Sequence, residues 1–249
     1  MDRGILVTDF DGVICDSVHE CMVSSHRAYQ RLTHPGRRVS DKISPGSKRN
    51  FLQLRPYIRS GEDYIILWNV INEGTSIPDQ SSFDAFSSSH KDEIQNYKNA
   101  LYSEREQMLH SERNFWLDLN PLFKAGKFLK NYDNLNRVHI LSTKRKEYVL
   151  EILRHHGIKF PESQVTFTPS HEKVNNLAAI LGQINHDSTS AYVEDQVDFL
   201  ISSKHLGVTP FLAGWGYVCA EQKNKARETG ILSITPNKFR KVLEQFVKS

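Results

Sequence analysis

The chain has 249 residues, of which 39% are hydrophobic and 24% are charged. These values are typical of a folded protein with a sizeable core, and they exclude a disordered chain and a disulfide-stapled mini-protein. Lys and Arg number 32 against 29 for Asp and Glu, so the formal net charge is only +3. Because the basic residues are also dispersed, we expect no nucleic-acid partner.

No apolar stretch approaches the roughly 20 residues that a membrane-spanning helix needs, so we expect no membrane segment. The sequence begins with Met1 and enters an apolar run almost at once, without the basic flank and cleavage site of a signal peptide. The three cysteines, Cys15, Cys21 and Cys219, form an odd set without paired metal-ligand spacing. These features predict a cytoplasmic protein in a reducing compartment.

Short apolar runs that end in polar residues predict buried parallel strands. The first run covers residues 5–8 and stops at the sequence Asp-Phe-Asp-Gly. Four further candidates are residues 138–143, 164–168, 191–195 and 210–214. Helical patterns over residues 144–156 and 173–183 separate some of them, and Gly157 is a plausible helix C-cap. This alternation predicts an α/β fold with a Rossmann-like parallel sheet.

The region after the first strand has a different pattern, because helical stretches such as residues 93–117 dominate it. Residues 40–46 and 75–89 are rich in Ser, Pro, Gly and Asp, so we expect loops there. The sequence therefore predicts a core domain of residues 1–15 plus 135–249 and a helical domain of residues 16–134 inserted after the first strand.

Two aspartates, Asp9 and Asp11, follow the first strand and are separated by one residue. In an extended chain they face the same way, and Gly12 allows a sharp turn beyond them. Two neighbouring carboxylates repel each other unless a cation or a shared proton offsets the charge, which favours a divalent metal. The alternative is an ordinary Asp-rich turn.

Polar residues also follow two later strands. Ser142 ends the second strand, where its hydroxyl and the adjacent amides, including that of Thr143, suit a phosphate, although a helix N-cap explains it as well. Lys173 precedes a helix and suits a phosphate oxygen, although a lone lysine is usually solvated. The fourth strand ends in a second acidic group, which consists of Glu194, Asp195 and Asp198.

Taken in chain order, these segments resemble the four motifs of the haloacid dehalogenase-like phosphohydrolases. The segments are Asp9-Phe10-Asp11-Gly12-Val13, Ser142-Thr143-Lys144, Lys173, and Glu194-Asp195 with Asp198. The sequence Gly-Trp-Gly-Tyr at 214–217 and the later Ile-Thr-Pro at 234–236 also resemble the end of phosphoglycolate phosphatase-like members. The helical insert is similar to the cap of that subfamily.

The resemblance implies a Mg²⁺-dependent phosphatase. It makes Asp9 the nucleophile that forms an aspartyl-phosphate and Asp11 the general acid and base. Ser142 and Lys173 would stabilise the transferring phosphoryl group. Mg²⁺ would be held by Asp9, the carbonyl of Asp11 and Asp195, with Glu194 or Asp198 contributing directly or through water.

Two departures from the family pattern leave alternatives open. The last motif reads Glu-Asp-Gln-Val-Asp, where the family usually has Gly-Asp or Asp-Asp followed by another acid. Lys173 lacks the usual following proline, so Lys144 is a weaker candidate for the phosphate lysine. In the insert, Arg49 and Arg55 are candidate substrate-binding residues, although solvated helix faces often carry such side chains.

We therefore expect hydrolysis of a small phosphorylated metabolite by a monomer or homodimer. One alternative is a phosphomutase that shares these motifs, and another is a non-catalytic binding or regulatory protein on the same fold.

Overall fold

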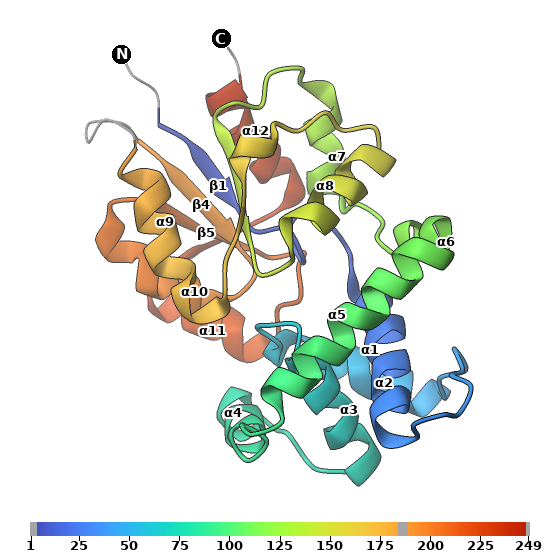
Figure 1. Cartoon of the computed structure of the whole chain (residues 1–249). Helices are drawn as coiled ribbons and strands as arrows, with labels where there is room; N and C mark the ends of the chain where they lie inside the picture. Colours follow the sequence, from blue (N-terminus) through green and yellow to red (C-terminus); the bar gives the residue numbers. More distant parts are fainter. Residues whose placement is uncertain (1–3, 184–188, 248–249) are drawn as a thin grey trace. The chain divides into compact units, whose positions relative to one another are not determined.

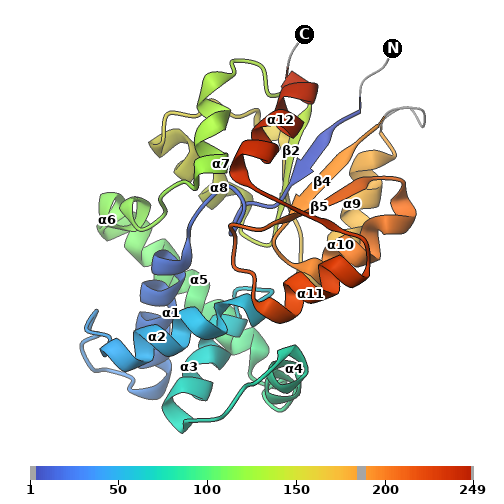
Figure 2. The same ribbon diagram turned by 180° about the vertical axis from the view of Figure 1, so that it is seen from behind.

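The computed structural model describes residues 4–183 and 189–247 of the chain. It divides into two compact units, which we describe one at a time (Figures 1 and 2). The first unit consists of residues 1–16 and 121–249, and the second consists of residues 17–120. Within the described residues, no helix is both long and apolar enough to cross a membrane.

The first unit is built on a six-stranded sheet in which all neighbouring strands are parallel, in the order β3-β2-β1-β4-β5-β6. The strands are β1 (Leu6–Thr8), β2 (Val138–Ser142), β3 (Val165–Phe167), β4 (Ala191–Glu194), β5 (Thr209–Ala213) and β6 (Leu232–Ile234). The predicted α/β class and parallel sheet are confirmed. Strand β1 lies in the middle, between β2 and β4, which places residues 6–8 at the centre of the core.

Helices cover both faces of this sheet (Figures 1 and 2). They are α7 (Lys124–Lys127), α8 (Lys146–His155), α9 (Lys173–Leu181), α10 (Val197–Ser203), α11 (Ala220–Glu228) and α12 (Pro236–Val247), with short 3₁₀ turns η2 (Phe128–Asn131), η3 (Glu162–Gln164), η4 (Ser170–Glu172) and η5 (Lys204–Leu206). On one face, Ile5 and Val7 pack with Leu177 of α9 and Leu200 of α10 in a single apolar cluster. Burial on both faces explains why the strands read as continuous apolar runs.

The chain leaves the first unit and returns to it at one place. The amide of Asp16 donates to the carbonyl of Pro121 at 2.8 Å, and the amide of Phe123 donates to the carbonyl of Ile14 at 3.0 Å. Residues 121–134, which the sequence analysis assigned to the insert, thus belong to the first unit. A Cβ added to Gly126 would lie 2.3 Å from the carbonyl oxygen of Ile14, so α7 packs directly on the segment after β1.

The second unit is helical. Its helices are α1 (Val18–Thr33), α2 (Pro45–Leu54), α3 (Asp63–Glu73), α4 (Gln80–Ser88), α5 (Ile94–Ser111) and α6 (Arg113–Asp118), with a 3₁₀ turn η1 (Arg55–Tyr57) after α2. Helix α1 packs against both α3 and α5. The carboxylate of Glu20 on α1 is fully buried and accepts from Arg105 of α5 at 2.7 and 2.8 Å and from the indole of Trp116 at 3.0 Å.

The prediction of a loop over residues 75–89 is wrong, because α4 occupies most of it. Asp79 caps this helix by accepting from the amide of Ser82 at 2.8 Å, and Phe83 anchors it with 2% of its surface exposed. The Ser and Asp residues that suggested a loop instead form the N-cap and the exposed face of a short helix. The predicted loop over residues 40–46 ends at Pro45, where α2 begins.

Candidate active site

The carboxyl ends of β1, β2 and β4 meet at one edge of the sheet. The register pairs Thr8 with Ile140 of β2 and with Val193 of β4. Asp9 follows directly, and its amide donates to the carbonyl of Val193 at 2.9 Å. Glu194 is one residue beyond Val193 on β4, and Ser142 is two residues beyond Ile140 on β2. Ligands of parallel α/β sheets bind at such an edge.

Two glycines allow the backbone to pass close to Asp195. Gly12 has a φ of +87°, and a Cβ placed there would lie 2.0 Å from a carboxylate oxygen of Asp195. Gly216 approaches from β5, and its added Cβ would lie 2.4 Å from the carbonyl oxygen of Gly12. Any side chain at either position would displace the carboxylate, so both glycines are required by close packing.

Lys173 lies between two buried carboxylates. Its Nζ is 2.9 Å from Oδ1 of Asp9 and 2.7 Å from Oε2 of Glu194. Glu194 also accepts from the hydroxyl of Tyr192 at 2.7 Å and from the amides of Asp195 and Gln196 at 3.1 and 3.2 Å. These four donors occupy both oxygens of Glu194. The carboxylate therefore holds Lys173 in place and fixes the turn after β4.

Burial sets the protonation of this cluster. It raises the pKa of Asp9 to about 7, and the negative charge of Glu194 adds to that effect, while Lys173 opposes it. Burial also tends to lower the pKa of Lys173, but Asp9 and Glu194 outweigh it and keep the pKa above its usual value. A phosphate or a cation that binds near Asp9 thus meets a charged lysine and a carboxyl group whose protonation changes readily near neutral pH.

Asp195 and Asp198 have different surroundings. Asp195 is 1% exposed, and its Oδ2 accepts from the amide of Tyr217 at 3.0 Å. Asp198 is the second residue of α10, and its carboxylate is 2.6 Å from Nζ of Lys225 on α11. The structure thus places Asp198 outside the acidic group, because the start of α10 directs it toward α11. Its predicted role as a metal ligand has no support in this geometry.

Asp11 and Lys144 form an ion pair at 3.4 Å, with the lysine side chain 1% exposed. Ser142 is also buried, and its hydroxyl oxygen accepts from the amide of Lys144 at 3.1 Å. This bond shapes the turn after β2, which Thr143 occupies. Helix α8 begins later, at Lys146, so Ser142 is not its N-cap. Each aspartate of the first motif therefore contacts its own buried lysine: Asp9 contacts Lys173, and Asp11 contacts Lys144.

Carboxylate oxygens of Asp9, Glu194 and Asp195 lie within 4.8 Å of one another. Oxygen ligands of this kind fit a hard divalent cation such as Mg²⁺. Glu194 already accepts from four donors, Lys173, Tyr192 and two backbone amides, so we expect Asp9 and Asp195 to be the side chains of this group that would hold the ion.

The sequence analysis missed three side chains around this cluster: Tyr192, Phe199 and Tyr217. Tyr192 and Glu194 share a strand face, since they are two residues apart, and that spacing was a usable signal. The Phe199 ring lies 5.0 Å from Nζ of Lys173, a contact that only the three-dimensional path of α10 creates. Tyr217 donates from its hydroxyl to Asp16 at 2.8 Å and so joins the Gly-Trp-Gly-Tyr turn to the segment after β1.

The two candidate substrate-binding arginines belong to the second unit. Arg55 is 5% exposed and stacks its guanidinium 5.4 Å from the centre of the Tyr64 ring, which is a packing contact within that unit. Arg49 lies on the exposed side of α2. Contact of either residue with a substrate stays a prediction.

Comparisons by sequence find no relatives: no protein-family model matches the chain, and no curated protein matches it. Solved structures do match over nearly the whole chain, although their sequence identities are low. A protein assigned as a phosphoglycolate phosphatase from Lactobacillus delbrueckii subsp. bulgaricus has 14% identity and a TM-score of 0.59, covering 100% of both chains.

Two further structures show the breadth of this similarity. A haloacid dehalogenase-like family hydrolase from Streptococcus pneumoniae has 12% identity and a TM-score of 0.55, covering 95% of this chain and 96% of its own. Protein tyrosine kinase A from Mycobacterium tuberculosis has 18% identity and a TM-score of 0.58, covering 97% and 98%. At such identities the match establishes the fold, and activity must be argued from the site. The chain has the fold of the haloacid dehalogenase-like hydrolases.

Proposed function

We propose that the protein is a metal-dependent phosphatase that hydrolyses a small phosphomonoester. The observation that carries the proposal is the cluster at the sheet edge, where Asp9 contacts Lys173 and its carboxylate lies within 4.8 Å of Asp195. This arrangement combines a nucleophile, a fixed cation for a phosphate oxygen and oxygen ligands for a metal.

In the proposed reaction, an oxygen of Asp9 attacks phosphorus while the bond from phosphorus to the ester oxygen breaks. Asp11 gives its proton to the departing alkoxide. A water then attacks the aspartyl-phosphate, Asp11 takes the proton of that water, and inorganic phosphate leaves with Asp9 restored. Lys173 and the turn at Ser142 hold the equatorial oxygens of the phosphoryl group. Lys144, 3.4 Å from Asp11, pairs with the carboxylate that Asp11 becomes once it has given up its proton.

Asp9 and Asp195 would hold Mg²⁺, which fits the carboxylate cluster. When bound, the ion offsets the negative charge of nucleophile and substrate as they approach each other.

Phosphate release from a panel of small phosphomonoesters, with Mg²⁺ and with EDTA, tests this proposal. We expect metal-dependent release by the wild-type protein and a loss of at least about 1000-fold in Asp9→Asn, because the amide is a poor nucleophile. Asp198→Asn is a matched control, since that carboxylate pairs with Lys225 away from the cluster, and it should retain activity. Full activity in Asp9→Asn would contradict the proposal, as would rearranged phosphate esters in place of free phosphate.

A further inference from the structure

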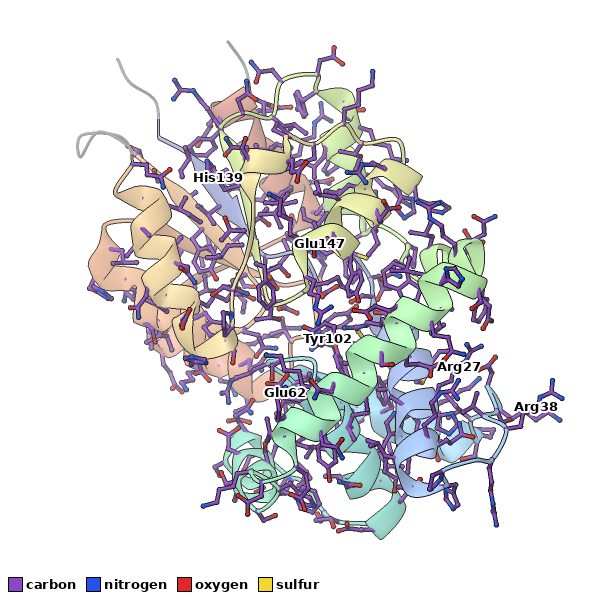
Figure 3. The ribbon with its side chains drawn as sticks, in the orientation of Figure 1. Arg27, Arg38, Glu62, Tyr102, His139 and Glu147 are labelled. Carbon is purple, nitrogen blue, oxygen red and sulfur yellow. The ribbon has the colours of Figure 1, made fainter. Side chains whose placement is uncertain are left out.

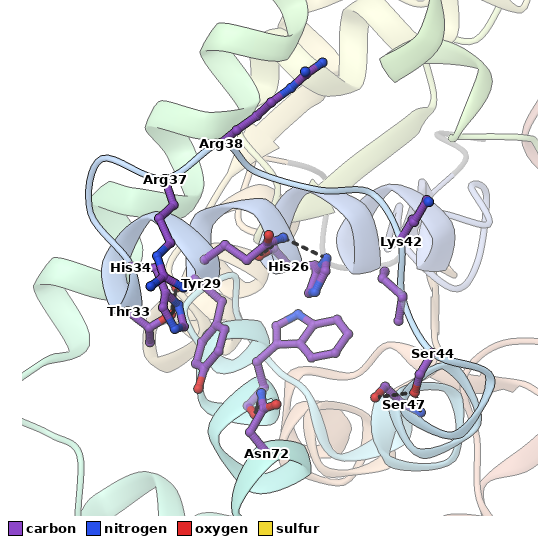
Figure 4. Close-up of a pocket in the computed structure, with 13 residues that line it drawn as sticks. His26, Tyr29, Thr33, His34, Arg37, Arg38, Lys42, Ser44, Ser47 and Asn72 are labelled. Atoms are coloured by element: carbon purple, nitrogen blue, oxygen red, sulfur yellow. Dashed lines mark hydrogen bonds between the residues drawn. The ribbon is translucent and has the colours of Figure 1, made fainter.

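A cavity of about 410 Å³ lies in the second unit, between α1, α3 and the segment that leads into α2 (Figure 4). All the residues that line it belong to the second unit, so it is complete without any residue of the candidate active site. Its volume falls in the range of small-molecule sites, roughly 300–1,000 Å³.

The inner wall of the cavity is aromatic. Tyr29 and His26 of α1 are half buried and contribute their rings, and Trp68 of α3 lies beneath, with its ring centre 4.8 Å from that of His26. The Trp68 indole donates to Ser25 at 2.8 Å and packs 5.3 Å from Phe51, so this wall is firmly held. A flat ring or another apolar group fits against such a surface.

The rim of the cavity is basic. Arg37, Arg38 and Lys42 line it from the segment between α1 and α2, and its lining contains no Asp or Glu. Among the described residues, none of these three side chains pairs with a carboxylate. The lining thus carries three cations without an ion-pair partner in the described part of the chain, although the carboxylates of Asp41 and Glu73 lie close enough to act on His26 and Tyr29. An unbalanced positive rim around a cavity attracts anions.

Neighbouring basic residues behave differently. Arg27 binds both oxygens of Asp41 at 2.6 and 2.8 Å and also contacts Glu112 at 2.8 Å, while Arg31 contacts Glu104 at 2.6 Å. Figure 3 shows Arg27 among the helices and Arg38 extending away from them. Asp41, Glu104 and Glu112 are therefore paired with Arg27 and Arg31, and none of them pairs with Arg37, Arg38 or Lys42.

The segment that carries the rim is also anchored at a second point. Gln30 donates to the carbonyl of Ser40 at 2.8 Å and accepts from its amide at 3.0 Å. Together with the pair of Arg27 and Asp41, these bonds fix residues 40–41 of the segment against α1. Of the rim residues, Arg37 turns toward the cavity beside His34 and Tyr29, whereas Arg38 and the ammonium of Lys42 extend away from the rings (Figure 4). The cation that lies beside the aromatic wall is then Arg37.

We propose that this cavity binds a small anion that carries a flat ring, for which a nucleoside monophosphate is the simplest natural example. The ring contacts His26 and Tyr29, and the anionic group binds Arg37, while Lys42 adds to the positive charge of the rim. This site is additional to the proposed phosphatase centre and does not depend on it.

Calorimetry tests the proposal on the full chain in EDTA, which suppresses metal-dependent turnover. The probes are four nucleoside monophosphates and 4-hydroxybenzoate, with adenosine and inorganic phosphate as partial probes. We expect at least one ring-bearing anion to bind at least 10-fold more tightly than adenosine or phosphate alone. Higher salt should weaken that binding. Equal binding of phosphate alone, or no binding by any ring-bearing anion, would overturn the proposal.

Two double variants locate the site. Arg37→Ala with Lys42→Ala removes two exposed rim cations and should weaken binding at least 10-fold. Lys91→Ala with Lys98→Ala removes the same charge elsewhere in the second unit and should leave binding unchanged. Amide NMR signals of residues 26–47 should shift in the wild-type protein and also in Ser142→Ala, which alters only the sheet edge. Equal losses in both double variants, or shifts confined to residues 9–12 and 142–144, would place binding elsewhere and reject the proposal.

Discussion

Glu194 is best understood as a positioning residue for Lys173. Its carboxylate is 0% exposed and accepts from Tyr192, from two backbone amides and from Lys173. A carboxylate that already accepts from four donors gains little by exchanging one of these donors for a metal ion. Asp195, in contrast, accepts from the amide of Tyr217 and adjoins Asp9 in the carboxylate group. The two adjacent acids therefore have separate tasks.

This division gives the first prediction. Glu194→Gln should lower the phosphatase rate at least about 10-fold, because Lys173 loses a charged partner, while the Mg²⁺ concentration for half-maximal activity changes less than about threefold. Asp195→Asn should raise that Mg²⁺ concentration at least about 10-fold. Titration of activity with Mg²⁺ separates the two effects. A large rise in the Mg²⁺ requirement of Glu194→Gln would make Glu194 a ligand.

Gly12 gives a second prediction at this scale. Gly12→Ala combines a φ of +87° with a Cβ 2.0 Å from the Asp195 carboxylate, so it should abolish activity and lower the free energy of unfolding by more than about 2 kcal/mol. Gly157→Ala is the matched control, because its φ is +74° but nothing lies within 4 Å of the added Cβ. The control should lose only about 1 kcal/mol and keep its activity. Urea unfolding and a phosphatase assay measure both, and equal effects would rule out the clash.

Several residues of the site could be predicted from the sequence because charged side chains stand directly after, or at the end of, apolar runs that form buried strands. Asp9, Lys173, Glu194 and Asp195 do lie together at the sheet edge. The contact of Phe199 with Lys173 depends on how α10 turns after β4, which no local pattern records. The same turn places Asp198 2.6 Å from Lys225, a contact that spacing alone did not indicate, and its role as a metal ligand stays a prediction.

At the scale of elements, the second unit depends on a buried charge pair between α1 and α5. Arg105→Met should lower the free energy of unfolding by about 3–5 kcal/mol, because Glu20 is fully buried and would lose its cation. Arg59→Met is the control, since its partner Asp84 is half exposed, and it should cost at most about 1 kcal/mol. Chemical unfolding followed by fluorescence compares them. Equal costs would show that burial of the pair contributes nothing.

The start of α3 predicts a pH dependence. Burial raises the pKa of Asp63 from 3.8 to about 6, although the amides of Arg59 and Ser60 oppose the shift. The folded state therefore favours the protonated acid. This contribution is fully present below about pH 4 and is lost as the pH rises through 6, which amounts to at most about 3 kcal/mol.

Asp63→Asn removes that titration. The difference in unfolding free energy between wild type and variant should change between pH 4 and pH 7, with the wild type losing stability relative to the variant as the pH rises. Urea unfolding at four pH values measures it. A difference that stays constant with pH would show that Asp63 titrates normally in the folded protein.

The elements that could be predicted are those whose burial imposes a clear pattern. Strands β1, β2 and β4 are buried on both faces and read as apolar runs. Strand β6 escaped prediction because it has three residues at the sheet edge and exposes 56% of Leu232. Helix α4 escaped because its polar N-cap and exposed face have the composition of a loop.

For the whole molecule, the change of sequence pattern after β1 indicated that a helical unit is inserted there. The sequence did not indicate that the chain re-enters the first unit at Pro121. Residues 121–134 carry helical and turn signals similar to those of the insert, and only their packing on Ile14 assigns them to the first unit. The fold itself leaves the activity open, since the matching structures include hydrolases and a tyrosine kinase. Function thus depends on the side chains at the sheet edge.

The hydrogen bond from Asp16 to Pro121 has a consequence for how this chain can change. It brings the two ends of a 104-residue insert as close together as the ends of a tight hairpin loop. The sheet therefore constrains only the distance between the two ends of the insert, and not the length or the fold of the chain between those ends. An insert of another size or shape could replace this one without altering the strand order, so the helical unit is free to diverge while the sheet edge is kept.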